Sequence, residues 1–552
     1  MTQRDGELGM LCEPYLLLPD ESSVGVAWVT DRRPELSRLV FGPVDVAPRL
    51  AKLTPAQLRS VDLGQLVPGV VAVDAVSVRL SAMAEDRESA LPPGLTGLRQ
   101  ALEAEVTVPR EVWRVTARAT GLAQGRDYAY RVVSSGVASE VARLSASPPE
   151  GAPVLRFLLT SDHQLGDAVP EAMRQATAIA GRFDAVLYAG DFVNVPDRAS
   201  EWFDDARGSA FFPSMRGILP NTPIFPVVGN HEVQGRREAG AMLAESFEGA
   251  LPRAVCPEGL SLSNYEALFP SPSGAHYYAV SIGGVRVVAL SAARVWRSER
   301  ADDDPEDRFV SSRYQEAFRV LGDVLGQRYG SHIIDDLAAG SEQYEWLRRE
   351  LSSPEFREAR LRVVVMHESP HSIGVNAMPQ FAHPVRLEER GSDGVLHGIR
   401  YDYPAAENIL LRDVAPLLEA SGVELVVGGH SHLWSRFVSE SGVNYLETSH
   451  AGSTHGAFDR SSGRRRARPP RRWNRHEVLP QGDPGGLAPV VPSVSPRRGA
   501  DDRPLPYVAD ADLSVFSILT VAADAGAKVE SYVFDARTPG VRAELFDEFA
   551  LG

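Results

Sequence analysis

The stretch FDAVLYAGD (residues 183–191) is a run of apolar residues that ends in Gly-Asp. The same design recurs in VLRFLLTSD (154–162), TPIFPVVGN (222–230), LRVVVMH (361–367) and VELVVGGH (423–430). Near-continuous apolar runs of this length are typical of strands that are covered on both faces. Helical patterns at 170–181, 341–351 and 404–420 lie between such runs. Because strands alternate with helices, we predict an α/β layer fold.

The apolar runs end in residue types that bind metal ions. These residues are Asp162, Asp191, Asn230 with His231, His367, and the pair His430 and His432. Ligands of open α/β sheets bind outside the carboxyl ends of the strands, so we expect these side chains to meet on one rim. Each signal alone is weak, because an Asp after a strand is commonly a helix cap. The ordered series predicts a shared site for divalent ions such as Mn, Fe or Zn.

Composition and charge exclude several classes of function. The chain has 552 residues, 73 acidic against 57 basic, and a formal net charge of −16. This acidic balance argues against a general binder of nucleic acid or of anionic membranes. No apolar stretch approaches the ~18 residues of a membrane span, and the first residues hold no signal-peptide core, which predicts a cytoplasmic location. Neither a Walker loop nor a GxSxG serine elbow occurs.

The pattern changes near residue 150. Residues 1–150 predict an all-β sandwich, with strands at 23–30, 111–122 and 127–136 and a Pro/Gly/Ser-rich hinge at 142–153. Residues 151–552 predict the α/β domain, which ends in a hairpin at 513–535. An Arg- and Pro-rich segment at about 461–506 has little periodicity and is interpreted as a solvated insertion.

The ordered series SDxQ, GDxxN, GNHE, His and GHxH resembles the calcineurin-like metallophosphoesterase superfamily. The β-region in front resembles the fibronectin-type domain of purple acid phosphatases, through PDESSVGVAWVTD (19–31) and LAQGRDYAYRV (122–132). The resemblance implies a four-layered α/β/β/α catalytic domain behind an N-terminal β-sandwich. It also implies hydrolysis of a phosphate mono- or diester by hydroxide held between two divalent metal ions.

The resemblance assigns a role to each residue of the series. Asp191 would bridge the two ions, and the other ligands would divide into a first set of Asp162 and His432 and a second set of Asn230, His367 and His430. His231 would bind no metal. It would face the phosphate and protonate or stabilise the leaving oxygen.

Two positions depart from the family pattern. Gln164 stands where many relatives have a metal-binding His, and its neutral carbonyl is a weaker ligand. Asn194 stands where purple acid phosphatases have the iron-binding Tyr, and it resembles the phosphodiesterase branch, in which this Asn contacts the substrate. The substrate, the metal pair and the oligomeric state stay open.

Two other functions are considered. The segment HESPH (367–371) matches the HExxH pattern of zinc metalloproteases, but Pro370 disfavours the helix that this motif needs. Under the phosphoesterase interpretation, His371 lies near the substrate or in a surface loop. The change at Gln164 also permits a binding module that keeps the fold without turnover.

Overall fold

The computed structural model describes residues 8–105, 107–234, 261–296, 331–377, 380–383, 385–402, 404–454, 456–457, 487–490, 502 and 505–552. Every residue of the predicted metal site lies within these ranges. Most of the predicted insertion at 461–506 lies outside the described residues.

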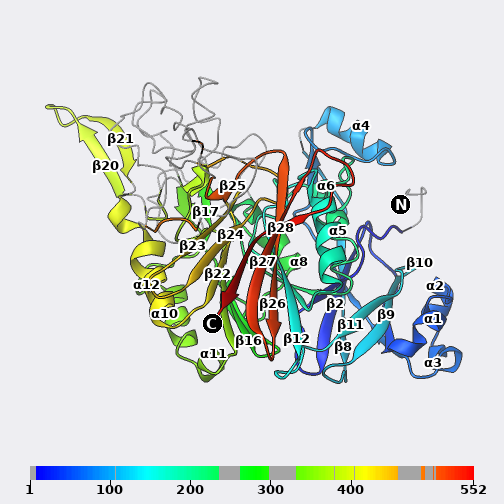
Figure 1. Ribbon diagram of the computed structural model, residues 1–552. Coiled ribbons are helices and arrows are strands. Elements are labelled where there is room, and N and C mark those ends of the chain that lie inside the picture. The colour runs from blue at the N-terminus through cyan, green and yellow to red at the C-terminus, as the bar shows by residue number, and fades with distance from the viewer. Residues whose placement is uncertain are drawn as a thin grey trace.

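Two large β-sheets pack face to face (Figure 1). The larger sheet has ten strands in the order β28 (Glu544–Leu551), β27 (Gly526–Asp535), β26 (Leu513–Ala522), β12 (Val154–Thr160), β13 (Ala185–Tyr188), β14 (Pro223–Pro226), β1 (Tyr15–Leu17), β2 (Ser23–Thr30), β8 (Trp113–Thr120) and β5 (Val76–Arg79). The second has seven strands in the order β15 (Tyr278–Ile282), β16 (Val285–Ala289), β19 (Leu361–Val365), β22 (Leu425–Gly428), β24 (Asn444–Thr448), β23 (Trp434–Val438) and β25 (Tyr507–Val508).

Helices cover the outer face of each sheet. The ten-stranded sheet carries α5 (Val169–Ala180), α6 (Ala199–Phe203), α7 (Phe211–Ser214) and α8 (Ser263–Leu268), whereas the seven-stranded sheet carries α10 (Glu342–Glu350), α11 (Pro354–Arg357) and α12 (Ala415–Ala420). Successive side chains of one strand enter different cores: Val186 packs toward α5, and Leu187 packs between the sheets. This two-sided burial explains the continuous apolar runs. The predicted α/β/β/α layering is confirmed.

The N-terminal region is β-rich and shares a sheet with the α/β part of the chain. A five-stranded sheet of β10 (Val137–Ala138), β9 (Asp127–Ser134), β3 (Ser37–Pro43), β4 (Val71–Asp74) and β11 (Ala142–Ser145) packs on β2 and β8. Trp28, Val115 and Tyr130 lie in the core between these sheets. Strand β1 pairs in parallel with β14, with Leu16 opposite Pro223, so the ten-stranded sheet runs across residue 150 without a break.

Several local elements differ from the sequence-based expectation. The stretch 404–420 begins with a 3-10 turn at Ala405–Glu407 and a π-helical turn at Leu410–Val414, and only then becomes α12. The expected final hairpin gains a third strand, β28, paired with β27. The sequence of residues 55–93 shows no clear pattern, but the structure places α2 (Pro55–Leu58), α3 (Leu63–Leu66), β4, β5 and β6 (Ala84–Asp86) there. Strand β6 pairs with β7 (Thr107–Pro109).

The remaining short elements are α1 (Ala47–Leu50), α4 (Thr96–Ala104), β17 (Arg294–Trp296) and β18 (Ser331–Ile333). The hairpin of β20 (Val385–Arg390) and β21 (Leu396–Asp402) projects from the body (Figure 1). Within the part of the chain that the structure describes, no helix has the length and apolar character needed to cross a membrane.

Candidate metal centre

The predicted ligands gather where parallel strands of both sheets end. Strands β12, β13 and β14 run parallel in one sheet, and β16, β19 and β22 run parallel in the other. Side chains just beyond five of these strands are buried and lie close together: Asp162, Asp191, Asn230, His367 and His430. The sheet pairing therefore brings the five strand ends to one rim between the sheets.

The backbone that aims these side chains is strained. Five residues of the site have positive φ angles although none is glycine: Asp162 (54°), Gln164 (39°), Asp191 (58°), His430 (77°) and His432 (53°). Residues other than glycine rarely adopt this region, and such strain concentrates at functional sites.

Two glycines make the close approach of the loops possible. A Cβ at Gly190 would lie 2.7 Å from the His367 Nδ1, and a Cβ at Gly429 would lie 2.6 Å from an Asp162 carboxylate oxygen. Gly190 also has a φ of 90°. Any larger residue at these two positions would push the ligands apart.

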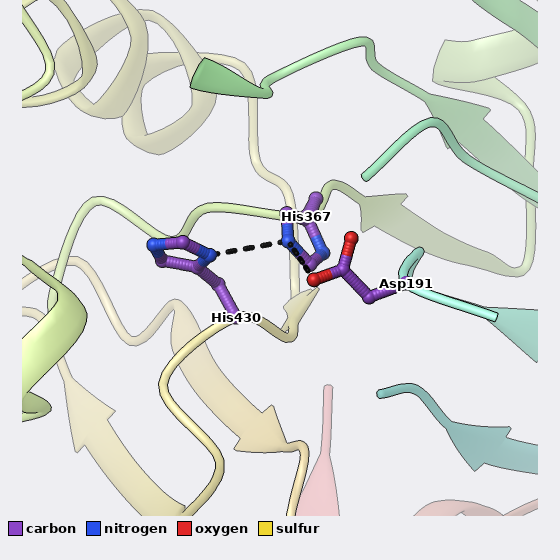
Figure 2. A group of neighbouring side chains, drawn as sticks. All are labelled: Asp191, His367 and His430. Atoms are coloured by element: carbon purple, nitrogen blue, oxygen red, sulfur yellow. Dashed lines mark hydrogen bonds and ion pairs between the residues drawn. The ribbon is translucent and has the colours of Figure 1, made fainter. Parts of the chain in front are cut away.

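The first ligand group consists of Asp191, His367 and His430 (Figure 2). The His367 Nε2 lies 3.3 Å from the Asp191 Oδ2 and 3.2 Å from the His430 Nδ1. The Asn230 Oδ1 lies 3.0 Å from each of these two ring nitrogens. A carboxylate, an amide oxygen and two imidazoles thus converge on one point, which suits a transition-metal ion.

The second ligand group consists of Asp162, Asp191 and His432. The His432 Nε2 lies 3.4 Å from the Asp162 Oδ1, and the Gln164 Nε2 lies 3.4 Å from the Asp191 Oδ2. The Asp162 Oδ1 and the Gln164 Oε1 are buried and have no hydrogen-bond partner. Buried acceptors without a donor are costly, and a bound cation would satisfy both. Asp191 is common to the two groups.

Outer hydrogen bonds determine which nitrogen of each imidazole faces the centre. The His367 Nδ1 donates to the Ala189 carbonyl at 2.7 Å, so Nε2 is the nitrogen that faces the centre. The His430 Nε2 contacts the Asn376 carbonyl at 3.2 Å, which leaves the lone pair on Nδ1. These are the nitrogens that face Asn230. Partners of this kind orient metal-binding imidazoles in proteins.

The two carboxylates have opposite electrostatic environments. Burial raises the pKa of Asp162 well above its ordinary value, and the neighbouring negative charge of Asp191 raises it further. Burial opposes ionisation of Asp191 too, but the positive charges of His367 and His231 outweigh it and hold the Asp191 pKa well below the ordinary range. The His367 pKa is raised to about 10 because Asp191 overcomes the effect of burial. A proton therefore stabilises this group at neutral pH, and a cation would replace it.

His231 and Asn194 lie beside the ligand groups. The His231 backbone N–H donates to the Asp191 Oδ1 at 2.8 Å, and its ring Nδ1 donates to the Asn194 carbonyl at 2.8 Å. The Asn194 Nδ2 donates to the Gln164 carbonyl at 3.0 Å. His371 lies elsewhere: its ring packs against Tyr445 at a centroid distance of 4.6 Å, and it belongs to neither ligand group.

Two buried acids support the site and were missed by sequence reasoning. Glu232 accepts backbone N–H groups from Gly229, Asp191 and Phe192, and burial raises its pKa to about 8. Glu447 accepts the Ser431 backbone N–H, and burial raises its pKa to about 7. Glu232 belongs to the GNHE motif, which was the available signal, whereas Glu447 lies in the mixed sequence NYLET of β24, where no local pattern marks it as buried.

The helix required by a zinc protease motif is absent from residues 367–371, all of which the structure describes. Glu368, which would be the protease base, is buried in an ion pair with Arg294. The protease hypothesis is therefore wrong, because Pro370 and the strand before His367 prevent the one-turn spacing that the motif needs.

Comparison with known proteins agrees with this arrangement. The profile of the calcineurin-like phosphoesterases matches residues 155–433, slightly more than half of the chain. The chain belongs to this family. It is therefore a phosphoesterase by family, and the matched range contains Asp162, Asp191, Asn230, His367 and the GHSH segment.

Solved structures share the fold at low sequence identity. A purple acid phosphatase from yellow lupin (Lupinus luteus) seeds is 13% identical and has a TM-score of 0.53, with 97% of this chain and 73% of that chain covered. PhoD is 12% identical with a TM-score of 0.45, covering 98% of this chain and 93% of its own. No curated protein matches the chain in sequence. The likeness to the lupin enzyme shows the metallophosphoesterase fold.

Proposed function

We propose that this protein hydrolyses phosphate mono- or diesters at a centre of two divalent metal ions, of Fe, Mn or Zn. The observation that carries the proposal is the sharing of Asp191 between two ligand groups. Beside one of them, two buried acceptor atoms, the Asp162 Oδ1 and the Gln164 Oε1, have no hydrogen-bond partner. Two cations held side by side polarise phosphoryl oxygens and make water a stronger nucleophile near neutral pH.

The ligands would divide between the ions as the two groups do. Asp191 would bind both ions, and the remaining ligands would form one set of Asp162, His432 and Gln164 and another of Asn230, His367 and His430. The hydrogen bonds on the far sides of His367 and His430 hold their rings in the orientation that binding needs.

His231 would act on the substrate. Its Nδ1 donates to the Asn194 carbonyl, so Nε2 is the nitrogen that would act on the phosphate or on the leaving oxygen. Its ring is only partly buried, which suits a group that must reach a ligand. We propose that it protonates or stabilises the leaving oxygen, while Asn194 contributes to the substrate edge of the site. For His371 the packing against Tyr445 offers no such support.

Metal analysis combined with two substrates tests this function. The purified chain is loaded with Mn²⁺ or Zn²⁺ and assayed with an aryl phosphate and with a bis-aryl phosphodiester. Two ions per chain together with release of phosphate or of the aryl alcohol are the expected result. A chain that binds at most one ion and cleaves neither ester would contradict the proposal and favour a binding module.

We also propose that residues 1–150 form a β-sandwich of the fibronectin type, followed by the catalytic domain at 151–552. Support comes from the two facing sheets and their common core around Trp28. Because β1 covers the edge of β14, we expect the fragment 151–552 to aggregate when it is expressed alone. A soluble, active fragment would show that the two parts fold independently.

A further inference from the structure

We propose that Glu201 is a positioning residue for His231, a role that rests on the proposed function. The link between them is the loop that contains Asn194. His231 Nδ1 donates to the backbone carbonyl of Asn194, so the orientation of this carbonyl sets the tautomer and the direction of the His231 ring.

The Glu201 carboxylate holds this loop from the opposite side. One oxygen, Oε2, accepts the backbone N–H of Asn194 at 2.7 Å and that of Val195 at 3.0 Å. The Glu201 side chain is 3% exposed, so these two bonds are formed away from water. Charge-assisted hydrogen bonds of this kind are stronger than neutral ones, and they define the peptide plane that carries the Asn194 carbonyl.

The second oxygen of Glu201 ties the loop to the N-terminal region. Its Oε1 accepts from Arg198 at 3.1 Å. Arg198 in turn donates to Asp86 at 2.8 Å and to Glu88 at 2.5 Å, and Asp86 is the last residue of β6. A backbone hydrogen bond from Ala84 to the Asp197 carbonyl, at 2.8 Å, runs alongside. Residues far from the metal ligands in sequence therefore brace the loop behind His231.

One carboxylate oxygen of Glu201 accepts hydrogen bonds from this loop, and the other accepts from Arg198. It acts through Asn194 and His231 and is not a catalytic residue. A glutamine at this position has only one acceptor oxygen and cannot satisfy both the two N–H groups and Arg198. We therefore expect Glu201→Gln to make the orientation of the Asn194 carbonyl less fixed and to weaken its hydrogen bond with His231. The residues of both ligand groups are unchanged in this variant.

Nitrogen-detected NMR of the full chain, metal-free and labelled at histidine, gives a readout independent of activity. The His231 signal is assigned by its loss in His231→Ala. In the wild type we expect a protonated Nδ1, and in Glu201→Gln a shift toward averaged tautomers. Glu350→Gln is the matched control, since it breaks a similarly buried ion pair with Arg286 on the other outer layer. An unchanged His231 signal in Glu201→Gln would overturn the proposal.

Kinetics of the metal-loaded chain give the second test. Glu201→Gln should slow turnover about 10–100-fold for a phosphate ester with a poor leaving group, and much less for a good one, with two ions retained. In the background of His231→Ala, the same change should have little further effect. A full additional loss in that background would overturn the proposal. If Glu201→Gln does not fold, Asp86→Asn with Glu88→Gln tests the same link and should show the same tautomer and leaving-group effects, and their absence would count against it.

The two proposals fail in different ways. A wild-type chain that cleaves no phosphate ester would refute the proposed function, whereas the NMR experiment would still decide whether Glu201 orients His231.

Discussion

The two ligand groups of the centre are built from similar residues but differ in how their atoms are satisfied. In the group of Asp191, His367 and His430, the side chains contact one another and the amide of Asn230. In the group of Asp162, Asp191 and His432, the Asp162 Oδ1 has no hydrogen-bond partner. In the first group Asp191 favours a proton on His367, whereas in the second group burial raises the pKa of Asp162 well above its ordinary value.

We infer that the group of Asp191, His367 and His430 is preorganised, whereas the buried Asp162 in the other group lowers the stability of the metal-free fold. A carboxylate in the protein interior without full compensation costs free energy, which a proton or a bound cation recovers. The following variants change the two halves separately, from the largest expected effect to the smallest.

Asp191→Ala removes the residue that the two groups share. Both ions should be lost, and activity with them, because neither group keeps a carboxylate that joins it to the other. Metal content by plasma mass spectrometry is the measurement, with Glu350→Gln as the control for general damage. If Asp191→Ala retained two ions, the two ligand groups would bind metal independently, and the claim that they depend on a shared Asp191 would be wrong.

Asp162→Asn changes the second group alone. It should cost one of the two ions and most of the activity. The metal-free variant should be more stable than the metal-free wild type, by about 0.5–2 kcal/mol, since it no longer buries a carboxyl group with one oxygen that lacks a hydrogen-bond donor. Chemical denaturation in the presence of a chelator measures this gain. A destabilised metal-free variant would show that the Asp162 carboxylate is satisfied without an ion.

His231→Ala touches neither group's ligands. Turnover should fall about 10²–10⁴-fold, most for esters with poor leaving groups, because a proton donor is lost. Two ions should remain bound. A parallel loss of metal would instead assign His231 to the ligands.

Gln164→His gives the second group an imidazole in place of a neutral amide. If the Gln164 side chain faces the ion, as its buried and unpartnered Oε1 suggests, metal affinity of this group should rise about 10-fold. Competition with a metal indicator is the measurement. Unchanged affinity would mean that the side chain at 164 does not reach the ion.

The stability of the metal-free chain should fall between pH 7 and 9. His367 has its pKa raised to about 10, so its contribution is complete below the ordinary value of 6.5 and is lost as the pH rises through 10. Glu232, with a pKa of about 8 against an ordinary 4.5, keeps a proton in the folded state and acts in the same direction. Each such proton is worth ~1.4 kcal/mol per pH unit.

Metal should reverse this trend, because ions bind the deprotonated ligands and bind more tightly as the pH rises. His276 is paired with Glu266 and Asp335 and has a pKa raised to about 9, so its stabilising contribution is lost as the pH rises, in both forms alike. The difference in melting temperature between the loaded and metal-free chains therefore isolates the centre, and it should grow from pH 7 to pH 9. A difference that shrinks over this range would contradict the assignment.

Much of the architecture followed from periodicity. The stretch 23–30 is β2 in full, and the apolar runs that end near Asp162 and Asp191 contain β12 and β13. Such runs were informative because each strand contacts a different core on each face. The strands end earlier than expected, since the positive φ angles at Asp162 and Asp191 turn the chain out of the sheet.

What escaped prediction depends on contacts between distant segments. No local pattern pairs Leu16 with Pro223, and so the fusion of the N-terminal strands with the catalytic sheet was unforeseen. Glu201 and Glu447 look like ordinary acids in the sequence, and their roles appear only once burial and partners are known. The proximity of the side chains in the two ligand groups was easier to predict, because each follows an apolar run and the family resemblance orders them.

Anomalous diffraction from crystals soaked in Mn²⁺ tests the central claim most directly. We predict two peaks that both contact Asp191, one also reaching Asp162 and His432, the other also reaching Asn230, His367 and His430. A solitary peak, or a pair with no carboxylate in common, would contradict this account.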